Sequence, residues 1–462
     1  MQWKWTKLPR PQKAATRFPV STELPMSEVT FNVLPGGAFS GSVRVPGDKS
    51  ISHRAVMFAS LAEGQSEVRG FLTGEDCLCT MKAFRAMGVR IDQLAETHLR
   101  VHGVGLHGLR EPAQALDLGN SGTSMRLMSG LLAAQAFPTT LLGDESLSRR
   151  PMRRIVDPLR QMGAQIETTA RNTAPLRIQP VDGGLHAITY KSPVSSAQVK
   201  SGILLAGLYA KGRTEVFEPE PSRDHTERML RAFGVKVEAE PGRAALQGGQ
   251  TLRACDVEVP ADISSATFFM LGAAIVPGSE LLLTDVGINP TRTGVIEILR
   301  RMGADIELLN QRQFGGEPVA DLRVRGRRLH GIDIGGELVA LAIDEFPAVF
   351  VAAACASGET VVTGAEELRV KETDRIQAMC DGLQALGISA LAQPDGARIT
   401  GGRMQGGTVD SRGDHRIAMS FAIAGLRAEQ PIRILDCANV NTSFPGFANL
   451  AASAGLRITV QG

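Results

Sequence analysis

Hydrophobic residues along the chain gather in six short runs that are apolar on almost every side. Helices of this kind are buried inside a large fold, because an exposed helix keeps a polar face. Each run is preceded by polar residues of the kind that cap helix N-termini. The six runs are RAVMFASLA from residue 54, MRLMSGLLAA from 125, VKSGILLAGLYA from 199, ATFFMLGAAIV from 266, PAVFVAAACA from 347 and RIAMSFAIAGL from 416. The residues that precede them are Lys49-Ser50, Asn120-Ser121, Ser195-Ser196, Ser264-Ser265, Asp344-Glu345 and Asp414-His415.

A second phrase recurs between these runs, at intervals of roughly 70 to 85 residues. Its copies are FRAMGVRI, LRQMGAQI, LRAFGVKV, LRRMGADI, LQALGISA and ASAGLRI, with glycines at 88, 163, 234, 303, 387 and 455. Each copy is typical of a helix end, a glycine C-cap and the start of a strand. The sequence therefore predicts an α/β protein of six units, each with one buried and one outer helix.

Six units divide most simply into two halves of three, and the halves share a phrase. VPGDKSIS at residue 45 matches VPADISSA at 259, which predicts that the chain crosses between the halves at 46–48 and 260–262. The predicted domains are domain I, from 26–47 plus 261–462, and domain II, from 48–260, with the active site in the cleft between them. Residues 1–25 are expected to be a disordered N-terminal extension.

The charge pattern points to a small anionic ligand rather than to a polymer or a membrane. The net charge is only +2, so no general basic field exists to hold nucleic acid. Helix N-termini attract anions, and equivalent helix starts in repeated units converge on the same side of a fold. Arginines stand at several of these starts, namely Arg54, Arg126, Arg150, Arg223, Arg375 and Arg416. We therefore expect a phosphorylated or carboxylated small substrate.

A few residues among these cations suit proton transfer. Lys is rare here, about 10 of the 50 cations, which makes Lys49 and Lys371 stand out beside Asp344 and Glu372. Lys and the carboxylic acids exchange protons at accessible pKa values, whereas Arg does not. The chain has no Walker A phosphate loop, no HExxH zinc motif and no strand-borne GxGxxG motif. We expect neither a cofactor nor a metal.

Several phrases, in order along the chain, resemble one enzyme family. They are PGDKSISHRA, LGNSGTSMR, RRPM, SSAQVKSGILLAG, SRDHTERML, IDEFPAVFVAAA, RVKETDRI, GDHRIAMS and TSFPGF. The chain is similar from about residue 34 to its end to 5-enolpyruvylshikimate-3-phosphate (EPSP) synthases, and most similar to the bacterial class II type. The resemblance implies two inside-out α/β globular domains, each built from three repeats. It also implies transfer of the enolpyruvyl group of phosphoenolpyruvate to the 5-hydroxyl of shikimate 3-phosphate.

The resemblance also carries roles onto individual positions. Lys49, Asp344 and Glu372 would be catalytic, with Asp344 as base for the hydroxyl and the order of Lys49 and Glu372 left open. The positions that would hold shikimate 3-phosphate are Lys49, Ser50, Arg54, Ser196, Ala197, Gln198, Arg223, Asp344 and Lys371. The positions that would hold phosphoenolpyruvate are Lys49, Asn120, Gly122, Arg150, Gln198, Arg375 and Arg416. The family further implies a cytoplasmic monomer that binds neither nucleic acid nor membrane, or a plastid enzyme if residues 1–25 are a transit segment.

Two departures and two alternatives accompany this interpretation. Ser443 stands where many members carry a Lys, so one phosphoenolpyruvate cation is missing, and Arg223 adds a cation where others have Ser. Gly122 is retained, and a methyl group there would crowd the inhibitor glyphosate more than the substrate.

The nearest rival, the UDP-N-acetylglucosamine enolpyruvyl transferase, uses a loop Cys that GDESLSRRP from residue 143 lacks. A non-catalytic anion-binding protein is the other alternative, although it has no need of Asp344 and Glu372 beside its ligand.

Overall fold

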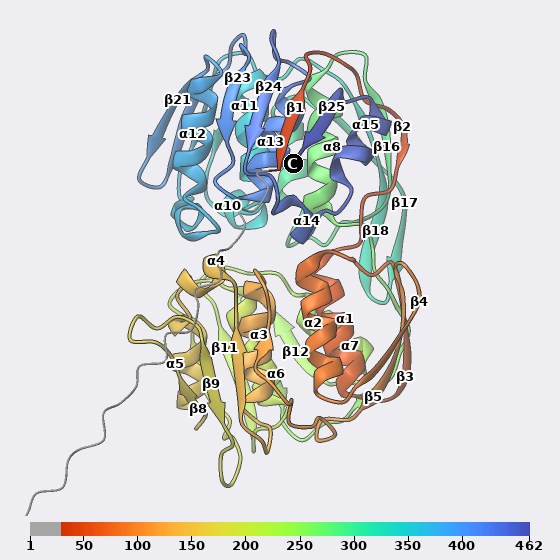
Figure 1. The fold of residues 1–462 in the computed structure, drawn as a ribbon, viewed down its shortest axis with the longest axis vertical. Coiled ribbons are helices and arrows are strands. Elements are labelled where there is room, and N and C mark those ends of the chain that lie inside the picture. The colour runs from red at the N-terminus through yellow and green to blue at the C-terminus, as the bar shows by residue number, and fades with distance from the viewer. Residues whose placement is uncertain (1–28) are drawn as a thin grey trace, which may run out of the picture.

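Six small mixed sheets of four or five strands are the repeated feature of the fold (Figure 1). The computed structural model describes residues 29–462, so the predicted extension lies outside the described residues. Each sheet joins parallel pairing on one side to two antiparallel strands, as in the order β10 (Thr189–Lys191), β11 (Arg213–Phe217), β13 (Arg243–Gln247) and β12 (Val237–Glu240). In the five-stranded sheet two short strands, β14 (Leu252–Arg253) and β15 (Val257–Glu258), both pair parallel with β3 (Ala62–Arg69). The same arrangement in all six sheets confirms the six α/β units predicted from the recurring phrases.

Two hydrophobic cores divide the described chain into two lobes, one above the other in Figure 1. One core draws its residues from 29–45 and 261–458, and the other from 51–259. We call the first group lobe I and the second lobe II. This division supports the predicted domain boundaries, which themselves stay a prediction.

Lobe II contains three sheets around inner helices α1 (Lys49–Leu61), α3 (Gly122–Leu132) and α6 (Ala197–Gly207). Its other helices are α2 (Glu75–Ala86), α4 (Glu145–Arg149), α5 (Arg153–Gln161) and α7 (His225–Ala232). Its strands are β3 (Ala62–Arg69), β4 (Arg90–Ala95), β5 (His98–Val104), β6 (Leu116–Asp117), β7 (Thr139–Leu142), β8 (Gln165–Glu167), β9 (Leu176–Gln179), β10 (Thr189–Lys191), β11 (Arg213–Phe217), β12 (Val237–Glu240), β13 (Arg243–Gln247), β14 (Leu252–Arg253) and β15 (Val257–Glu258).

Lobe I repeats the plan around inner helices α8 (Ile263–Ile275), α11 (Phe346–Cys355) and α13 (His415–Ala424). Its other helices are α9 (Gly294–Arg301), α10 (Glu337–Leu341), the 3-10 helix η1 (Glu366–Val370), α12 (Arg375–Ala385), α14 (Val440–Ser443) and α15 (Phe447–Ala454). Its strands are β1 (Thr30–Val33), β2 (Ser40–Val43), β16 (Glu280–Gly287), β17 (Asp305–Phe314), β18 (Glu317–Arg325), β19 (Asp333–Ile334), β20 (Glu359–Val362), β21 (Ser389–Gln393), β22 (Gly396–Thr400), β23 (Gly407–Asp410), β24 (Ile432–Leu435) and β25 (Ile458–Gln461).

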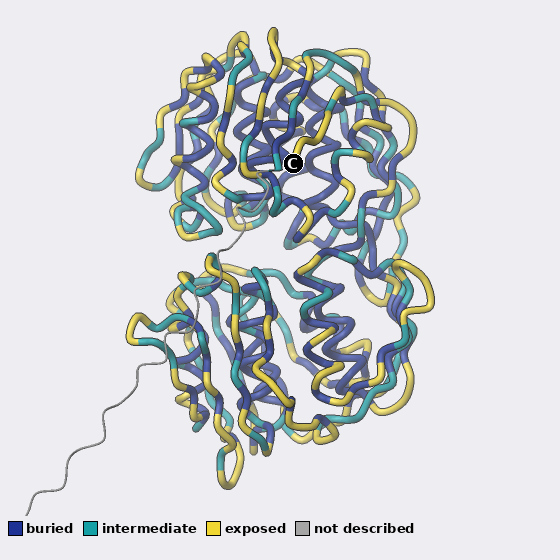
Figure 2. The backbone as a smooth tube through the Cα atoms, viewed as in Figure 1, coloured by how far each residue is buried: buried dark blue, intermediate teal, exposed yellow. Residues whose placement is uncertain are grey.

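The inner helices are buried along most of their length, as their sequences predicted (Figure 2). Every residue of α8 is buried, and so are nine of the ten residues of α11. The phrase glycines also behave as expected: all six have positive φ and lie at or just beyond a helix end. A side chain with a Cβ atom would be strained there, which explains why glycine recurs at these positions.

The first described strands return to the second half of the chain. β1 pairs antiparallel with both β24 and β25, and β2 pairs parallel with β16. The two predicted crossings lie side by side: the Asp48 amide donates to the Pro260 carbonyl at 2.8 Å, and the Asp262 amide donates to the Pro46 carbonyl at 2.9 Å. The lobes are therefore joined by two hydrogen-bonded passages.

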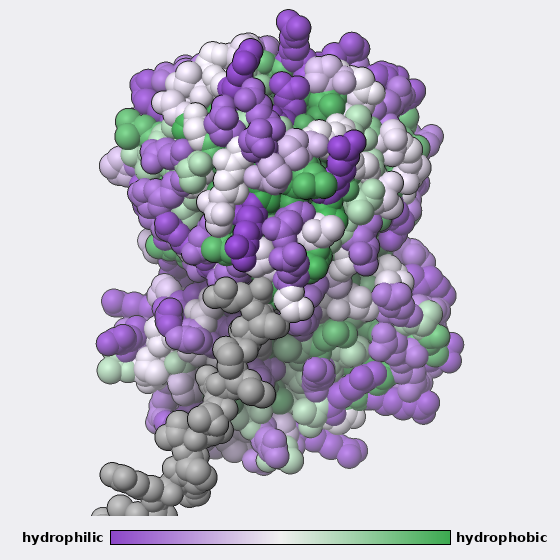
Figure 3. All heavy atoms as spheres, turned by 45° about the horizontal axis from the view of Figure 1, so that its top comes forward, coloured by the Kyte–Doolittle hydropathy of each residue, from purple (hydrophilic) through white to green (hydrophobic). Residues whose placement is uncertain are grey.

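Figure 3 shows one face of the molecule. Hydrophilic residues cover most of both lobes in Figure 3, and hydrophobic residues are scattered among them. Within residues 29–462, no helix is both long and apolar enough to span a bilayer.

Candidate active site between the lobes

Starts of helices from both lobes bring charged side chains to the interface between them. Arg223, in the loop before α7, forms an ion pair with Asp344, which precedes α11. Arg150 Nη1, at the end of α4, lies 3.4 Å from Glu372 Oε1, which precedes α12. The predicted residues of the two halves therefore meet, as the convergence of helix starts in repeated units suggested.

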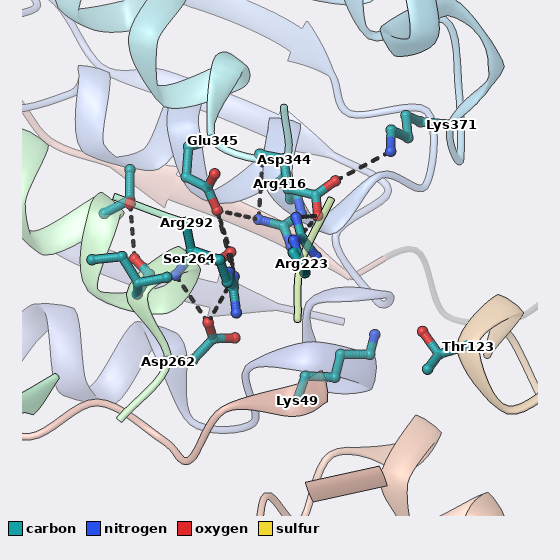
Figure 4. A network of polar contacts seen from close by, with 12 residues as sticks. Lys49, Thr123, Arg223, Asp262, Ser264, Arg292, Asp344, Glu345, Lys371 and Arg416 are labelled. Atoms are coloured by element: carbon teal, nitrogen blue, oxygen red, sulfur yellow. Dashed lines mark hydrogen bonds and ion pairs between the residues drawn. The ribbon is translucent and has the colours of Figure 1, made fainter. Parts of the chain in front are cut away.

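Asp344 is surrounded by cations from both lobes (Figure 4). Its carboxylate lies 3.4 Å from Lys371 Nζ and 3.6 Å from Arg375 Nη1, in addition to the Arg223 pair. The Arg416 guanidinium holds the Asp344 backbone carbonyl with a 3.0 Å hydrogen bond. Burial raises the pKa of Asp344, but the four cations outweigh burial and hold its pKa well below the ordinary value.

Glu372 has a similar environment on the other side of the site. Arg375 Nη2 donates to its carboxylate at 2.7 Å, in addition to the Arg150 contact. Arg375 itself is fully buried and fixed by Asp414, which accepts from its Nε at 2.8 Å. Burial raises the pKa of Glu372, but the charges of Arg375 and Arg150 lower it by more, so its pKa lies well below the usual range.

Lys49 is the first residue of α1, so the helix start directs its side chain toward the interface (Figure 4). Its ammonium forms an ion pair with the buried Asp76 of α2, and the side chain is 20% exposed. His415 lies nearby at the start of α13. Burial is the main cause that lowers the pKa of His415 well below its ordinary value, and the positive charges of Lys49 and Arg416 lower it as well. Asp76 and His415 were not among the predicted site residues.

Four of the residues predicted to hold phosphoenolpyruvate, Asn120, Gly122, Arg150 and Gln198, lie in lobe II, whereas Arg375 and Arg416 belong to lobe I. Asn120 accepts from Arg150 Nη2 at 2.7 Å and donates to Asp144 at 2.7 Å. Gln198 accepts from Arg126 at 2.6 Å, and its amide nitrogen donates to Thr123 at 3.0 Å.

Gly122 begins α3 beside two of these arginines. A Cβ atom built on it would come within 2.7 Å of Arg126 Nη1 and 3.4 Å of Arg150 Nη1. Arg126 was noted in the sequence only as a cation at a helix start, and the structure places it between Gly122 and Gln198.

The residues predicted to hold shikimate 3-phosphate are less uniform. Arg54 is buried, and its guanidinium donates to Thr226, Ser201 and the Ser50 carbonyl at 2.7 to 2.9 Å. Its contact with a substrate therefore stays a prediction, because every guanidinium nitrogen already has a protein partner. Ser50 is half-buried in the first turn of α1.

Ser196 and Ala197 lie at the start of α6, where the Ser196 side chain caps the helix. The Ser196 amide donates to Glu218 at 2.7 Å, and Glu218 in turn pairs with the buried Lys200 at 3.0 Å. The sequence pattern did not predict that Glu218 and Lys200 hold the start of α6, although Lys200 within SAQVKS is one of the few lysines in the chain.

Nothing in the described part of the chain suggests a metal centre, because no three His, Cys, Asp or Glu side chains there could share an ion. A hollow of about 580 Å³ lies against the β2, β16, β17 and β18 sheet and is lined by none of the predicted residues. The interface is therefore defined by its ion pairs and hydrogen bonds and not by the size of a hollow.

Comparison with known proteins identifies the family. A sequence profile of EPSP synthase, described as 3-phosphoshikimate 1-carboxyvinyltransferase, matches residues 33–450. The chain belongs to the EPSP synthase family. A Methylococcus capsulatus 3-phosphoshikimate 1-carboxyvinyltransferase is 67% identical over 436 residues, which are 94% of this chain and 99% of the relative. One from Alkalilimnicola ehrlichii is 62% identical over 432 residues, 93% of this chain and 96% of the relative.

Solved structures agree with this placement in the EPSP synthase family. The EPSP synthase structure from Acinetobacter baumannii has a TM-score of 0.85 and 56% identity, and the match covers 94% of this chain and 100% of that chain. The enolpyruvyl transferase fold expected from the resemblance is therefore confirmed, and the chain is a transferase of this family.

Proposed function

We propose that the interlobe site transfers the enolpyruvyl (carboxyvinyl) group of phosphoenolpyruvate to the 5-hydroxyl of shikimate 3-phosphate. The products are 5-enolpyruvylshikimate 3-phosphate, a precursor of chorismate and the aromatic amino acids, and inorganic phosphate. The observation that carries the proposal is the meeting of Asp344 and Glu372 from lobe I with Lys49, Arg150 and Arg223 from lobe II. Such a site can bind two phosphorylated acids and also exchange protons with them.

The cations divide between the two substrates by position. Arg150 and Arg375 contact Glu372, and Arg416 lies in the first turn of α13. We assign phosphoenolpyruvate to these three arginines, with Asn120 and Gly122 beside them. Arg223 and Lys371 contact the carboxylate of Asp344, and we assign shikimate 3-phosphate to these two cations. We assign Lys49 and Gln198 a place between the two ligands. Ser50, Arg54, Ser196 and Ala197 complete the shikimate 3-phosphate side as predictions. Arg guanidinium groups suit phosphate and carboxylate because they donate two parallel hydrogen bonds.

The reaction needs three proton transfers that side chains can supply: one from the hydroxyl, one to C3 and one from C3. In the addition step the 5-hydroxyl oxygen bonds to C2 of phosphoenolpyruvate, Asp344 takes the hydroxyl proton, and C3 receives a proton from Lys49 or Glu372. The deprotonated Lys49 or Glu372 then takes a proton back from C3 of the tetrahedral intermediate as the bond between C2 and the phosphate oxygen breaks, so inorganic phosphate leaves and the double bond returns. No redox change occurs.

The low pKa of Asp344 explains how binding and catalysis are linked. In the protein alone, cations keep the carboxylate ionised and weakly basic. Bound phosphate and carboxylate groups compete for the same cations, so they weaken that stabilisation and raise the pKa of Asp344 toward the range of a useful base. The same reasoning applies to Glu372, which shares Arg375 and Arg150 with phosphoenolpyruvate.

Measurement of phosphate release tests the proposal. The protein is supplied with phosphoenolpyruvate and either shikimate 3-phosphate, UDP-N-acetylglucosamine or no acceptor. We expect release only with shikimate 3-phosphate. Release with the UDP-sugar would favour the sister transferase, and binding of both substrates without release would favour an anion-binding protein. A monomeric state and a cytoplasmic location remain predictions, and the plastid alternative depends on residues outside the described range.

A further inference from the structure

One buried arginine lies at the junction of the lobes and has no part in the proposed reaction. Arg292 is in the loop before α9, and its side chain is 3% exposed. Its Nη1 donates to Asp48 Oδ2 at 2.5 Å. The other oxygen of Asp48 accepts from the Ile51 amide at 2.8 Å and so caps α1, the helix that begins with Lys49. Arg292, from lobe I, therefore holds the helix start that carries Lys49 in lobe II.

The other nitrogen of the same guanidinium reaches the neighbourhood of Asp344. Arg292 Nη2 donates to Ser264 Oγ at 2.5 Å and to Asp262 Oδ1 at 3.2 Å. Ser264 donates in turn to the carboxylate of Glu345, which is the residue after Asp344 and precedes α11 (Figure 4). The planar Arg292 guanidinium thus connects Asp48, which precedes Lys49, through Ser264 to Glu345, which follows Asp344.

We propose that Arg292 is a positioning residue that fixes Lys49 and Asp344 relative to each other across the two lobes. The inference rests on the proposed function, since Lys49 and Asp344 exchange protons with the same pair of substrates. Proton transfer depends steeply on distance, and a misplacement of about 1 Å can cost on the order of 100-fold in rate. Neither residue touches Arg292, so its effect passes through Asp48 and through Ser264 with Glu345.

The charge of the cluster explains why an arginine is needed. Three carboxylates, Asp48, Asp262 and Glu345, gather around Arg292, and all four side chains are buried. Burial raises the pKa of Asp48, but Arg292 and other neighbours lower it to about 2, so this carboxylate stays charged. A lysine supplies one point charge, whereas the guanidinium fork reaches Asp48 on one side and Ser264 on the other. Arg292→Lys therefore keeps the charge but loses the connection between the two lobes.

The experiment compares Arg292→Lys, Arg292→Gln and Ser264→Ala with the wild type, using Arg301→Gln as the matched control. Arg301 lies on α9, is 54% exposed and forms an ion pair with Glu297 on the same helix. For each protein, kcat comes from phosphate release with saturating phosphoenolpyruvate and shikimate 3-phosphate. Calorimetry gives the dissociation constant and the stoichiometry for shikimate 3-phosphate. The stoichiometry reports the folded fraction, which a merely structural role would change.

We expect kcat to fall about tenfold or more in Arg292→Lys, further in Arg292→Gln, and about threefold or more in Ser264→Ala. The dissociation constant should stay within about threefold, because most predicted shikimate 3-phosphate contacts lie in lobe II, and the stoichiometry should stay near one. The inference is overturned if folded Arg292→Lys keeps kcat within twofold of the wild type, or if its stoichiometry falls in step with kcat. If neither Arg292 variant folds, an unchanged kcat in Ser264→Ala overturns it. An inactive wild type would instead refute the proposed function.

Discussion

Replacing Asp344 with Asn should separate catalysis from binding at the interlobe site. The substitution keeps the shape of the side chain and one hydrogen-bond acceptor, but it removes the proposed base. It also removes the carboxylate that pairs with Arg223 and lies 3.4 Å from Lys371, two cations assigned to shikimate 3-phosphate. The two effects have opposite signs, because the first lowers turnover and the second frees cations for the ligand.

The size of each effect follows from the chemistry and the exposure of the groups. A positioned general base contributes about 100- to 10,000-fold, so kcat should fall by that factor, roughly 3 to 5 kcal/mol of transition-state stabilisation. Asp344 is 15% and Arg223 is 23% exposed, so solvent screens their attraction only in part. An ion pair in this setting contributes about 1 kcal/mol. Shikimate 3-phosphate should therefore bind as well as before or up to about fivefold more tightly.

The assay combines steady-state phosphate release with calorimetric binding of shikimate 3-phosphate. Asp333→Asn is the matched control, since Asp333 is an exposed carboxylate in β19 of the same lobe. The reasoning is refuted if Asp344→Asn keeps more than a tenth of the wild-type kcat. It is equally refuted if the dissociation constant rises in proportion to the loss of kcat, because Asp344 would then serve binding alone.

Three further predictions concern the surroundings of the site. Gly122→Ala places a methyl group 2.7 Å from the Arg126 guanidinium, so the inhibition constant for glyphosate should rise more than the KM for phosphoenolpyruvate; equal changes would contradict the crowding argument. Asp48→Asn should cost roughly 2 kcal/mol of unfolding free energy at pH 6, because the pKa of Asp48 is lowered from 3.8 to about 2. A carboxyl group with a lowered pKa stabilises the fold above about pH 4 and loses this effect as the pH falls toward 2. Urea unfolding at pH 3 should therefore show about half of the difference in unfolding free energy between wild type and Asp48→Asn that is seen at pH 6. A difference that does not change with pH would contradict the assignment. Ser443→Lys restores a cation in α14, beside the start of α13, and should lower the KM for phosphoenolpyruvate about threefold; an unchanged KM would show that position 443 does not reach the substrate.

The six-unit fold could be predicted because each unit is encoded by local sequence patterns, and these patterns recur along the chain. Apolar runs, polar helix starts and phrase glycines each depend on a few neighbouring residues, and their recurrence separates them from chance. The polar starts also indicated which residues gather between the lobes, since Arg223 and Arg150 of lobe II reach Asp344 and Glu372, which precede α11 and α12. Lys49, Asp344 and Glu372 stood out because they differ chemically from the arginines around them.

The partners of these residues could not be predicted, because they come from distant parts of the chain. Arg292 belongs to the phrase NPTR, which indicated only the start of an outer helix, yet it pairs with Asp48 from 244 residues away. Asp76 was part of another outer helix start, and its pairing with Lys49 depends on how α2 packs against α1. The hydrogen bonds of Arg54 to Ser201 and Thr226 also depend on residues far along the chain, and its contact with a substrate stays a prediction.

A crystal structure with shikimate 3-phosphate and phosphoenolpyruvate bound to Asp344→Asn would test the central claim most directly. The slow variant should preserve both substrates. We expect the 5-hydroxyl within hydrogen-bond distance of Asn at position 344, with Arg150, Arg375 and Arg416 on phosphoenolpyruvate and Arg223 and Lys371 on shikimate 3-phosphate. A 5-hydroxyl directed away from position 344, or both substrates bound within one lobe, would contradict it.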